Sequence, residues 1–269
     1  MISPEQDILR ICRPYLSANE RTDTMTAWGI TDRGVAREQN QDAFHLEILH
    51  DSSQALLTVC DGMGGAQSGN VASRVATETF LEELRVSLKP GLSLKSIRTA
   101  LFDATYAANA KVYQKARSDT AYYGMGTTLV GAVVTASLAV IANVGDSRAY
   151  IIDQDGGVEQ ITRDHSVVED LLYRGELSRE QARVHPSKNL ITRALGTEEE
   201  VQPDIFSVDM QPGDYLLLCS DGLTNVVEDM EILYEVLHGG EPAQCCERLV
   251  KLANDRGGPD NISIILFSN

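Results

Sequence analysis

Residues 56–65 read Leu-Leu-Thr-Val-Cys-Asp-Gly-Met-Gly-Gly, an apolar run that ends in Asp61. The apolar run Tyr215–Cys219 likewise leads through one serine into Asp221, and Asp260 comes shortly before a further apolar run. A strand buried on both faces does not normally end in a carboxylate, because removing an unpaired charge from water costs free energy. A turn alone explains a single Asp-Gly pair, but the recurrence makes these positions candidates for a functional site.

A fourth acid, Asp146, follows the apolar stretch that ends in Val144-Gly145, and basic residues near the four acids are too few to pair with them. Two carboxylates about 4 Å apart repel by about 4 kcal/mol at an effective dielectric constant of about 20. If the fold gathers these acids, a cation must lie among them, and oxygen ligands select Mg²⁺ or Mn²⁺ over Zn²⁺. Hydrophobic periodicity does not show whether they gather.

The composition excludes some classes of protein. The chain has 269 residues, with 23 Lys and Arg against 39 Asp and Glu, and a formal net charge of −16. This argues against nucleic-acid binding, which relies on basic residues that neutralise phosphates. A content of 43% hydrophobic and 23% charged residues is typical of a folded soluble protein. The five cysteines lack CxxC spacing and no secretory signal is visible, so we expect reduced thiols and a cytoplasmic location.

Residues 120–145 contain no charged residue and are long enough to span a membrane. However, the stretch contains polar side chains and three glycines in its first half, and no Lys/Arg cluster flanks it. We therefore interpret it as a buried hairpin with arms at residues 128–134 and 138–144, and we expect no membrane interaction.

Helix signals occur in three parts of the chain. Ser3-Pro4-Glu5-Gln6 is typical of a helix start and predicts a short helix to about Arg13, within an N-terminal extension of residues 1–24. Apolar residues at helical spacing predict two helices on either side of Lys89-Pro90-Gly91. Two more helices are predicted near the C-terminus, at residues 230–237 and 243–254.

Short strands are predicted between these helices, at residues 27–31, 43–48, 56–60, 148–152, 158–161, 215–219 and 262–267. The order of strands and helices lacks the regular alternation of a doubly wound parallel sheet. It favours antiparallel sheets with helices packed outside them.

Several motifs follow one another along the chain. They are Thr31-Asp32-Arg33-Gly34, Arg37-Glu38-Gln39-Asn40-Gln41-Asp42, Asp61-Gly62-Met63-Gly64-Gly65, Gly124-Met125-Gly126-Thr127-Thr128, Val144-Gly145-Asp146-Ser147-Arg148, Thr162-Arg163-Asp164-His165-Ser166, Ile191-Thr192-Arg193-Ala194-Leu195-Gly196, Ser220-Asp221-Gly222-Leu223 and Asp260-Asn261-Ile262-Ser263. Over residues 25–268 the chain thus resembles the metal-dependent protein serine/threonine phosphatases of type 2C, bacterial branch. One Asp-Gly-Met-Gly-Gly motif would be weak support, whereas so many matches in order are specific.

The resemblance implies an α+β fold, a four-layer α-β-β-α sandwich of two antiparallel sheets flanked by helices. Residues 25–269 would form the phosphatase domain, with a flap subdomain at about residues 162–196 to which we assign substrate choice. Within the flap, Ser166 is interpreted as a helix N-cap in preference to a metal ligand.

The resemblance also implies a two-metal site at one edge of the sandwich. Asp61 would bridge both metals, and the carbonyl of Gly62 would ligate the second. Asp221 and Asp260 would complete the shell of the first metal. Asp42 would hold metal-bound waters.

Other residues would support this centre. Asp146, together with Asp221, would form a weaker third metal site, and Arg37 would bind the substrate phosphate through its planar guanidinium. Gln41 and Asn261 would lie behind the ligands. Gln41 stands where the family usually carries Glu, so we expect somewhat weaker metal binding, because Gln brings no negative charge.

The implied activity is hydrolysis of phosphoserine and phosphothreonine in proteins, with Mn²⁺ or Mg²⁺ as cofactor. A hydroxide bridging two divalent ions would attack the phosphorus, and no phosphoenzyme would form. We expect a monomer that acts on phosphorylated protein substrates in signal transduction. The rival interpretation is a catalytically weak pseudophosphatase that serves as a phosphoprotein-binding signalling module, and only Gln41 points to it.

Overall fold

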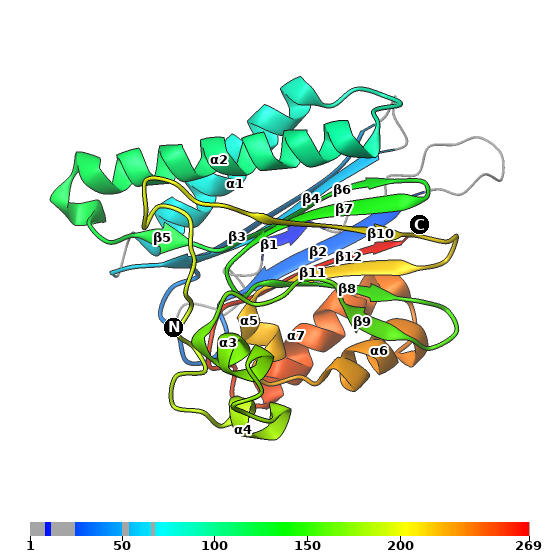
Figure 1. Cartoon of the computed structure of the whole chain (residues 1–269). Helices are drawn as coiled ribbons and strands as arrows, with labels where there is room; N and C mark the ends of the chain where they lie inside the picture. Colours follow the sequence, from blue (N-terminus) through cyan, green and yellow to red (C-terminus); the bar gives the residue numbers. More distant parts are fainter. Residues whose placement is uncertain (1–8, 12–24, 50–53, 66–67, 269) are drawn as a thin grey trace, which may run out of the picture.

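Two stacked antiparallel sheets form the centre of the computed structural model, which describes residues 9–11, 25–49, 54–65 and 68–268 (Figure 1). The first sheet has the strand order β1 (Leu9–Ile11), β2 (Thr26–Asp32), β12 (Ile262–Ser268), β11 (Tyr215–Cys219), β8 (Arg148–Ile152) and β9 (Val158–Gln160). The second has the order β10 (Asp204–Asp209), β7 (Leu138–Val144), β6 (Leu129–Thr135), β4 (Gln54–Met63) and β3 (Asp42–Leu49), with β5 (Gly126–Thr127) paired to the end of β4. Strand β2, near the start of the chain, pairs with β12, its last strand, so these two distant segments lie side by side.

Helices cover both outer faces of the stacked sheets (Figure 1). The second sheet is covered by α1 (Gly69–Ser87) and α2 (Leu94–Ser118), and the first by α5 (Asp221–Thr224), α6 (Asp229–His238) and α7 (Cys245–Asp255). The flap contains α3 (Val167–Tyr173) and α4 (Arg179–Arg183), and the turns η1 (Thr120–Tyr122) and η2 (Pro242–Gln244) precede β5 and α7.

Three apolar layers hold this arrangement together. Phe80 and Leu101 belong to the layer between α1, α2 and the second sheet. Leu57 and Phe267 belong to the layer between the two sheets, and Leu249 to the layer between the first sheet and α6 and α7. The result is the predicted four-layer α+β sandwich.

The structure confirms the main predicted elements. The hairpin β6–β7 and the helix pairs α1–α2 and α6–α7 lie where the patterns place them. In the flap, the Ser166 hydroxyl accepts a hydrogen bond from the Glu169 N–H (3.2 Å), as expected for an N-cap. Ser178 and Gln181 form a capping box at the start of α4.

The predicted N-terminal helix is wrong where the structure describes that segment. Leu9–Ile11 form β1, which pairs with β2 so that Leu9 lies opposite Thr31. An isolated helix of about ten residues is marginal in water, whereas the edge of β2 offers backbone groups that an extended segment can satisfy. The rest of the predicted helix lies outside the described residues, as do residues 17–24 and Cys12.

Within the described ranges, no helix is long and apolar enough to cross a membrane. The uncharged stretch at residues 120–145 forms η1, β5 and the β6–β7 hairpin, as the hairpin interpretation predicted.

Phe80 offers a test of this packing. Its fully buried ring lies against Gly131 of β6, where an added Cβ would come within 2.6 Å of two ring atoms. We expect Phe80→Ala to lower the free energy of unfolding by about 3–5 kcal/mol, because it leaves a cavity between helix and sheet. Urea denaturation measures the change. Val86→Ala on the exposed face of the same helix is the control, with an expected change below about 0.5 kcal/mol; equal effects of the two variants would contradict the packing.

Candidate metal centre

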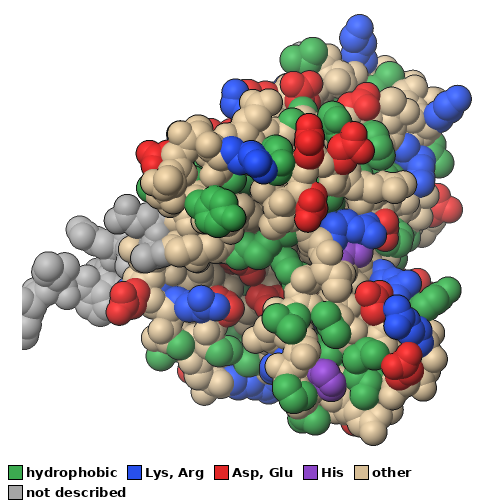
Figure 2. All heavy atoms as spheres, turned by 60° about the vertical axis from the view of Figure 1, so that its left-hand side comes forward, with side chains coloured by type: hydrophobic (Ala, Val, Ile, Leu, Met, Phe, Trp, Pro, Cys, Tyr) green, Lys and Arg blue, Asp and Glu red, His purple; other side chains and the backbone are tan. Residues whose placement is uncertain are grey.

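The strand ends bring the predicted acids to one edge of the sandwich. A cavity of about 220 Å³ is lined there by Arg37, Gln41, Asp61, Gly62, Met63, Gly64, Thr128, Asp146, Asn189, Ile191, Asp221, Asp260 and Asn261. Asp42 on β3 pairs directly with Asp61 on β4. Figure 2 shows acidic side chains at the bottom of a recess on this face. All of the predicted site residues therefore gather here, although they come from segments far apart in the sequence.

Hydrogen bonds fix the backbone of Asp61. Its N–H donates to the hydroxyl of Thr128 (2.9 Å), and its carbonyl accepts from the Thr128 N–H (2.9 Å) and the Thr127 hydroxyl (2.8 Å). The Thr128 hydroxyl also shares a hydrogen bond with Ser147 (2.7 Å), next to Asp146. The two aspartates are thus held in one polar network.

Gly62 follows at a point where no side chain fits. A Cβ there would lie 2.1 Å from the carbonyl oxygen of Gly69 and 2.5 Å from that of Gln41. The Gly62 N–H donates to the Gln41 carbonyl (3.2 Å), which also accepts from the Ser73 hydroxyl (2.6 Å). The Asp61-Gly62 end of β4 is therefore held between the loop before β3 and the start of α1.

Asp42 is buried beside this end of β4. One carboxylate oxygen accepts a hydrogen bond from the Ser220 hydroxyl (2.8 Å), whereas Oδ1 is buried without a hydrogen-bond partner. Burial, together with the nearby charges of Asp221 and Asp260, raises the pKa of Asp42 to about 7.

The pKa values of the neighbouring acids are also raised. Burial raises the pKa of Asp61 well above its usual value, and the charges of Asp42, Asp221 and Asp146 raise it further. Burial likewise raises the pKa of Asp146, as do Asp221 and Asp164, and burial and Asp260 raise that of Asp221. Repulsion among these carboxylates opposes their ionisation.

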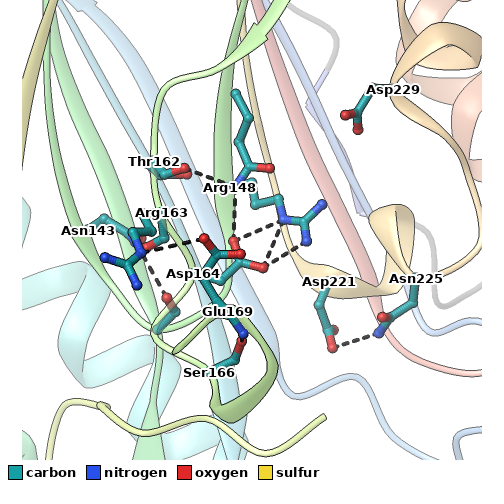
Figure 3. A network of polar contacts seen from close by, with 12 residues as sticks. Asn143, Arg148, Thr162, Arg163, Asp164, Ser166, Glu169, Asp221, Asn225 and Asp229 are labelled. Atoms are coloured by element: carbon teal, nitrogen blue, oxygen red, sulfur yellow. Dashed lines mark hydrogen bonds and ion pairs between the residues drawn. The ribbon is translucent and has the colours of Figure 1, made fainter. Parts of the chain in front are cut away.

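Asp221 begins α5, one residue after the end of β11. Its Oδ2 accepts from the Asn225 side chain (2.8 Å; Figure 3), and its Oδ1 is buried without a hydrogen-bond partner. Asp221 therefore leaves one oxygen available to a ligand in the cavity.

Asp260 and Arg37 face each other across the mouth of the cavity. The Arg37 guanidinium, about half exposed, donates to Asp260 Oδ2 (2.7 Å). Behind them, the Asn261 side-chain amide donates to the carbonyls of Arg33 (2.8 Å) and Gln39 (2.9 Å), and its oxygen accepts from the Gln41 N–H (2.8 Å). Asn261 thus holds the loop that carries Arg37 against the start of β12.

The donor set fits hard divalent cations. Two buried carboxylate oxygens, one from Asp42 and one from Asp221, have no hydrogen-bond partner, and the acids around them have raised pKa values. Among the described residues, no group of three or more His, Cys, Asp or Glu side chains is placed to hold a metal by itself. A cation here would therefore be bound by few carboxylates, with backbone carbonyls and water in the remaining positions, as Mg²⁺ commonly is.

The contribution of His165 depends on partners that no local sequence signal reveals. The ring is buried, and its Nδ1 accepts a hydrogen bond from the Gly145 N–H (3.0 Å). In the neutral form of the ring, Nε2 lies 3.2 Å from the Asp204 carboxylate and 3.0 Å from the Arg193 guanidinium. Burial lowers the pKa of His165, which favours this neutral form. His165 thereby anchors the turn that carries Asp146.

Comparison with known proteins agrees with this fold. The family model described as protein phosphatase 2C matches residues 33–253. A serine/threonine phosphatase stp from Listeria innocua is 41% identical over 237 residues, which cover 88% of this chain and 92% of the relative. The chain therefore belongs to the protein phosphatase 2C family.

Solved structures show the same relationship. Serine/threonine phosphatase Stp1 from Staphylococcus aureus has a TM-score of 0.84 and 37% identity, over 94% of this chain and 99% of that one. The catalytic domain of the serine/threonine protein phosphatase PstP, solved with two manganese ions, has a TM-score of 0.77 and 32% identity, over 91% of this chain and 97% of that one. Both likenesses cover more than nine tenths of this chain.

The raised pKa of Asp42 leads to a prediction for the metal-free protein. A carboxyl whose pKa is about 7 when folded and near 3.8 when unfolded binds more protons in the folded state between these values. Stability should therefore rise as the pH falls from about 8 toward 6.5. With EDTA present, we expect Asp42→Asn to be more stable than wild type at pH 8 and to depend less on pH. Thermal unfolding measures both; a variant that is less stable at pH 8 with an unchanged pH dependence would contradict this.

Proposed function

We propose that this chain hydrolyses phosphoserine and phosphothreonine in proteins at a centre of divalent cations, Mn²⁺ or Mg²⁺, held by Asp61, Asp221 and Asp260. The observation that supports this most is the convergence of buried carboxylates with raised pKa values in one cavity beside an arginine. Membership of the protein phosphatase 2C family and the serine/threonine phosphatases among its relatives support the same activity. The two manganese ions of the PstP structure support a centre of two ions.

Divalent cations bound here would supply the activation of a water molecule and the neutralisation of phosphoryl charge. Asp61, whose backbone is fixed by Thr128, and the Gly62 carbonyl beside it would help to hold them. Asp42, buried behind the cavity, would orient water through hydrogen bonds. No side chain of the site is needed as a nucleophile, so no phosphoenzyme is expected.

Arg37 would bind the phosphate of the substrate. Its guanidinium lies at the mouth of the cavity and already contacts an anion, the carboxylate of Asp260. A cation bound by Asp260 would weaken this ion pair and leave the guanidinium for a phosphate, whose oxygens suit its planar fork.

Gln41 and Asp146 would affect how strongly the centre binds metal and how many ions it holds. The Gln41 side chain lies against Gly69 and donates weakly to the Gly65 carbonyl (3.4 Å), so it adds no charge to the cavity. Metal binding is then weaker than with Glu, but the direct ligands are unaffected. Asp146 lies in the same cavity as Asp221, which supports a third, weaker metal site between them.

The protein would act in the cytoplasm as a monomer on phosphorylated proteins in signalling. The rival function, a pseudophosphatase that only binds phosphoproteins, depends on Gln41 alone. The intact set of Asp61, Asp221, Asp260 and Arg37 favours catalysis.

Hydrolysis of p-nitrophenyl phosphate tests the proposed function. We expect turnover with Mn²⁺ that stops when EDTA removes the metal and returns when Mn²⁺ is restored. Asp61→Asn, which removes one charge at nearly constant volume, should reduce kcat by at least about a hundredfold, since charge neutralisation depends on the bound cations. Absence of turnover with every divalent ion tried, despite measurable binding of a phosphopeptide, would favour the pseudophosphatase.

The role of Arg37 has its own test. We expect Arg37→Ala to raise KM for a phosphothreonine peptide about tenfold or more, because a charge-assisted hydrogen bond to the phosphate is lost. Mn²⁺ affinity, measured by titration calorimetry, should stay the same or increase, since the competing partner of Asp260 is removed. An unchanged KM would contradict a phosphate-binding role.

A further inference from the structure

A buried asparagine of α2 binds the segment that leads out of the flap. Asn109 is fully buried, and its side-chain amide donates to the backbone carbonyls of Glu198 (3.2 Å) and Glu199 (3.0 Å). Its Oδ1 accepts a hydrogen bond from the Gly196 N–H (2.8 Å). One side chain thus holds both ends of a short loop, residues 195–199, against the helix.

The chemistry of Asn109 matches this loop. The loop presents carbonyl oxygens and an N–H to the same side chain, and an amide both donates and accepts hydrogen bonds. Ionised aspartate offers no donor, and alanine offers neither group. The loop also lies close to the helix, because a Cβ at Gly196, where φ is +85°, would come within 2.4 Å of Val112 Cγ1. Loss of the amide therefore leaves these backbone groups without their partner.

On its other side the loop pairs with β5. The Leu195 N–H donates to the Thr127 carbonyl (2.8 Å), and the Thr127 N–H donates to the Leu195 carbonyl (3.1 Å). Both residues are fully buried. An added Cβ at Gly126 would lie 3.0 Å from the Leu195 carbonyl oxygen, so β5 and the loop are in close backbone contact. The loop therefore lies between α2 and β5 (Figure 1).

Strand β5 leads to the end of β4 that carries the proposed metal ligands. Thr127 lies opposite Gly62 in the pairing of the two strands, and its hydroxyl donates to the Asp61 carbonyl (2.8 Å). Thr127 thus binds the loop through its backbone and Asp61 through its side chain. Direct contacts therefore connect Asn109 with the backbone of Asp61, through the loop and β5.

Asn109 is not among the described residues that line the metal cavity, so any effect on bound ions must pass through these contacts. We propose that Asn109 is a positioning residue of the metal centre: by holding the 195–199 loop against β5, it fixes the backbone of Asp61 and Gly62, whose oxygens would bind divalent cations. The proposal rests on the proposed metal-dependent function and adds to it a residue that determines metal affinity. Residues that orient metal ligands commonly change the affinity when they are replaced.

Titration calorimetry with Mn²⁺ on the full chain tests this role. We expect Asn109→Ala to raise the Kd for Mn²⁺ about three- to tenfold, because the oxygens of Asp61 and Gly62 are held less firmly. The near-isosteric variant Asn109→Asp keeps the acceptor for the Gly196 N–H but loses the donors, so it should raise the Kd as well. It decides the question if the alanine variant does not fold.

A double-mutant cycle tests whether the effect passes through β5. Thr127→Val removes the hydroxyl that donates to Asp61 at nearly constant shape. If Asn109 acts through Thr127, the double variant Asn109→Ala/Thr127→Val should raise the Kd by less than the product of the two single increases. Without Mn²⁺, hydrogen exchange of the Leu195 and Thr127 amides should also become faster in Asn109→Ala.

Leu101→Ala is the matched control. Leu101 is fully buried on the same helix and belongs to the apolar layer between the helices and the second sheet. Its loss should lower the Tm measured in EDTA, as the loss of Asn109 does, but leave the Kd for Mn²⁺ unchanged. An equal rise in Kd for both variants would show general destabilisation and would overturn the proposal.

The outcomes separate this proposal from the proposed function. If wild type binds Mn²⁺ and hydrolyses p-nitrophenyl phosphate, but both Asn109 variants keep the wild-type Kd, Asn109 is not a positioning residue and the phosphatase function stands. Effects of Asn109→Ala and Thr127→Val that multiply fully also contradict the path through β5. If wild type neither binds Mn²⁺ nor hydrolyses this substrate, the proposed function itself fails, and the role of Asn109 with it.

Discussion

The repulsion among carboxylates that share one small cavity is the constraint on which the rest of the structure depends. Asp42, Asp61, Asp146 and Asp221 all have raised pKa values, first through burial and then through one another's charges. Such an arrangement destabilises the protein by itself at neutral pH. The proposed divalent cations would offset these charges, so the stability of the site and the proposed chemistry would depend on the same ions.

Hydrogen bonds with neighbouring residues hold these acids in position. Thr128, Ser220 and Asn225 each provide a hydrogen bond to the backbone or carboxylate of an acid, and Asn261 ties the loop of Arg37 to the start of β12. Beside these hydrogen bonds, the Oδ1 atoms of Asp42 and Asp221 have no hydrogen-bond partner. The rigid sheets thus hold the acids in place, while Asn189 and Ile191 of the flap line the cavity beside them. Many enzymes combine rigidly held functional side chains with more variable loops that contact the substrate.

The elements that depend on a local sequence pattern could be predicted from the sequence. Helical spacing predicted α2, and the acids after apolar runs predicted the strand ends at the site. The sequence could not show β1 or β10, because short strands form only by pairing with strands distant in the chain. The ion pair of Arg37 with Asp260 joins residues 223 positions apart, and no local signal reveals it. The anchoring of Gly145 by His165 was missed for the same reason: a single histidine has no periodicity, and its role depends on the partners that the fold supplies.

The most direct measurement is anomalous diffraction from a crystal of the protein soaked in Mn²⁺. We predict two strong peaks in the 220 Å³ cavity, each about 2–2.5 Å from a carboxylate oxygen of Asp61, Asp221 or Asp260. Full manganese occupancy elsewhere with no peak in this cavity, or carboxylates that turn away from one another, would contradict the account.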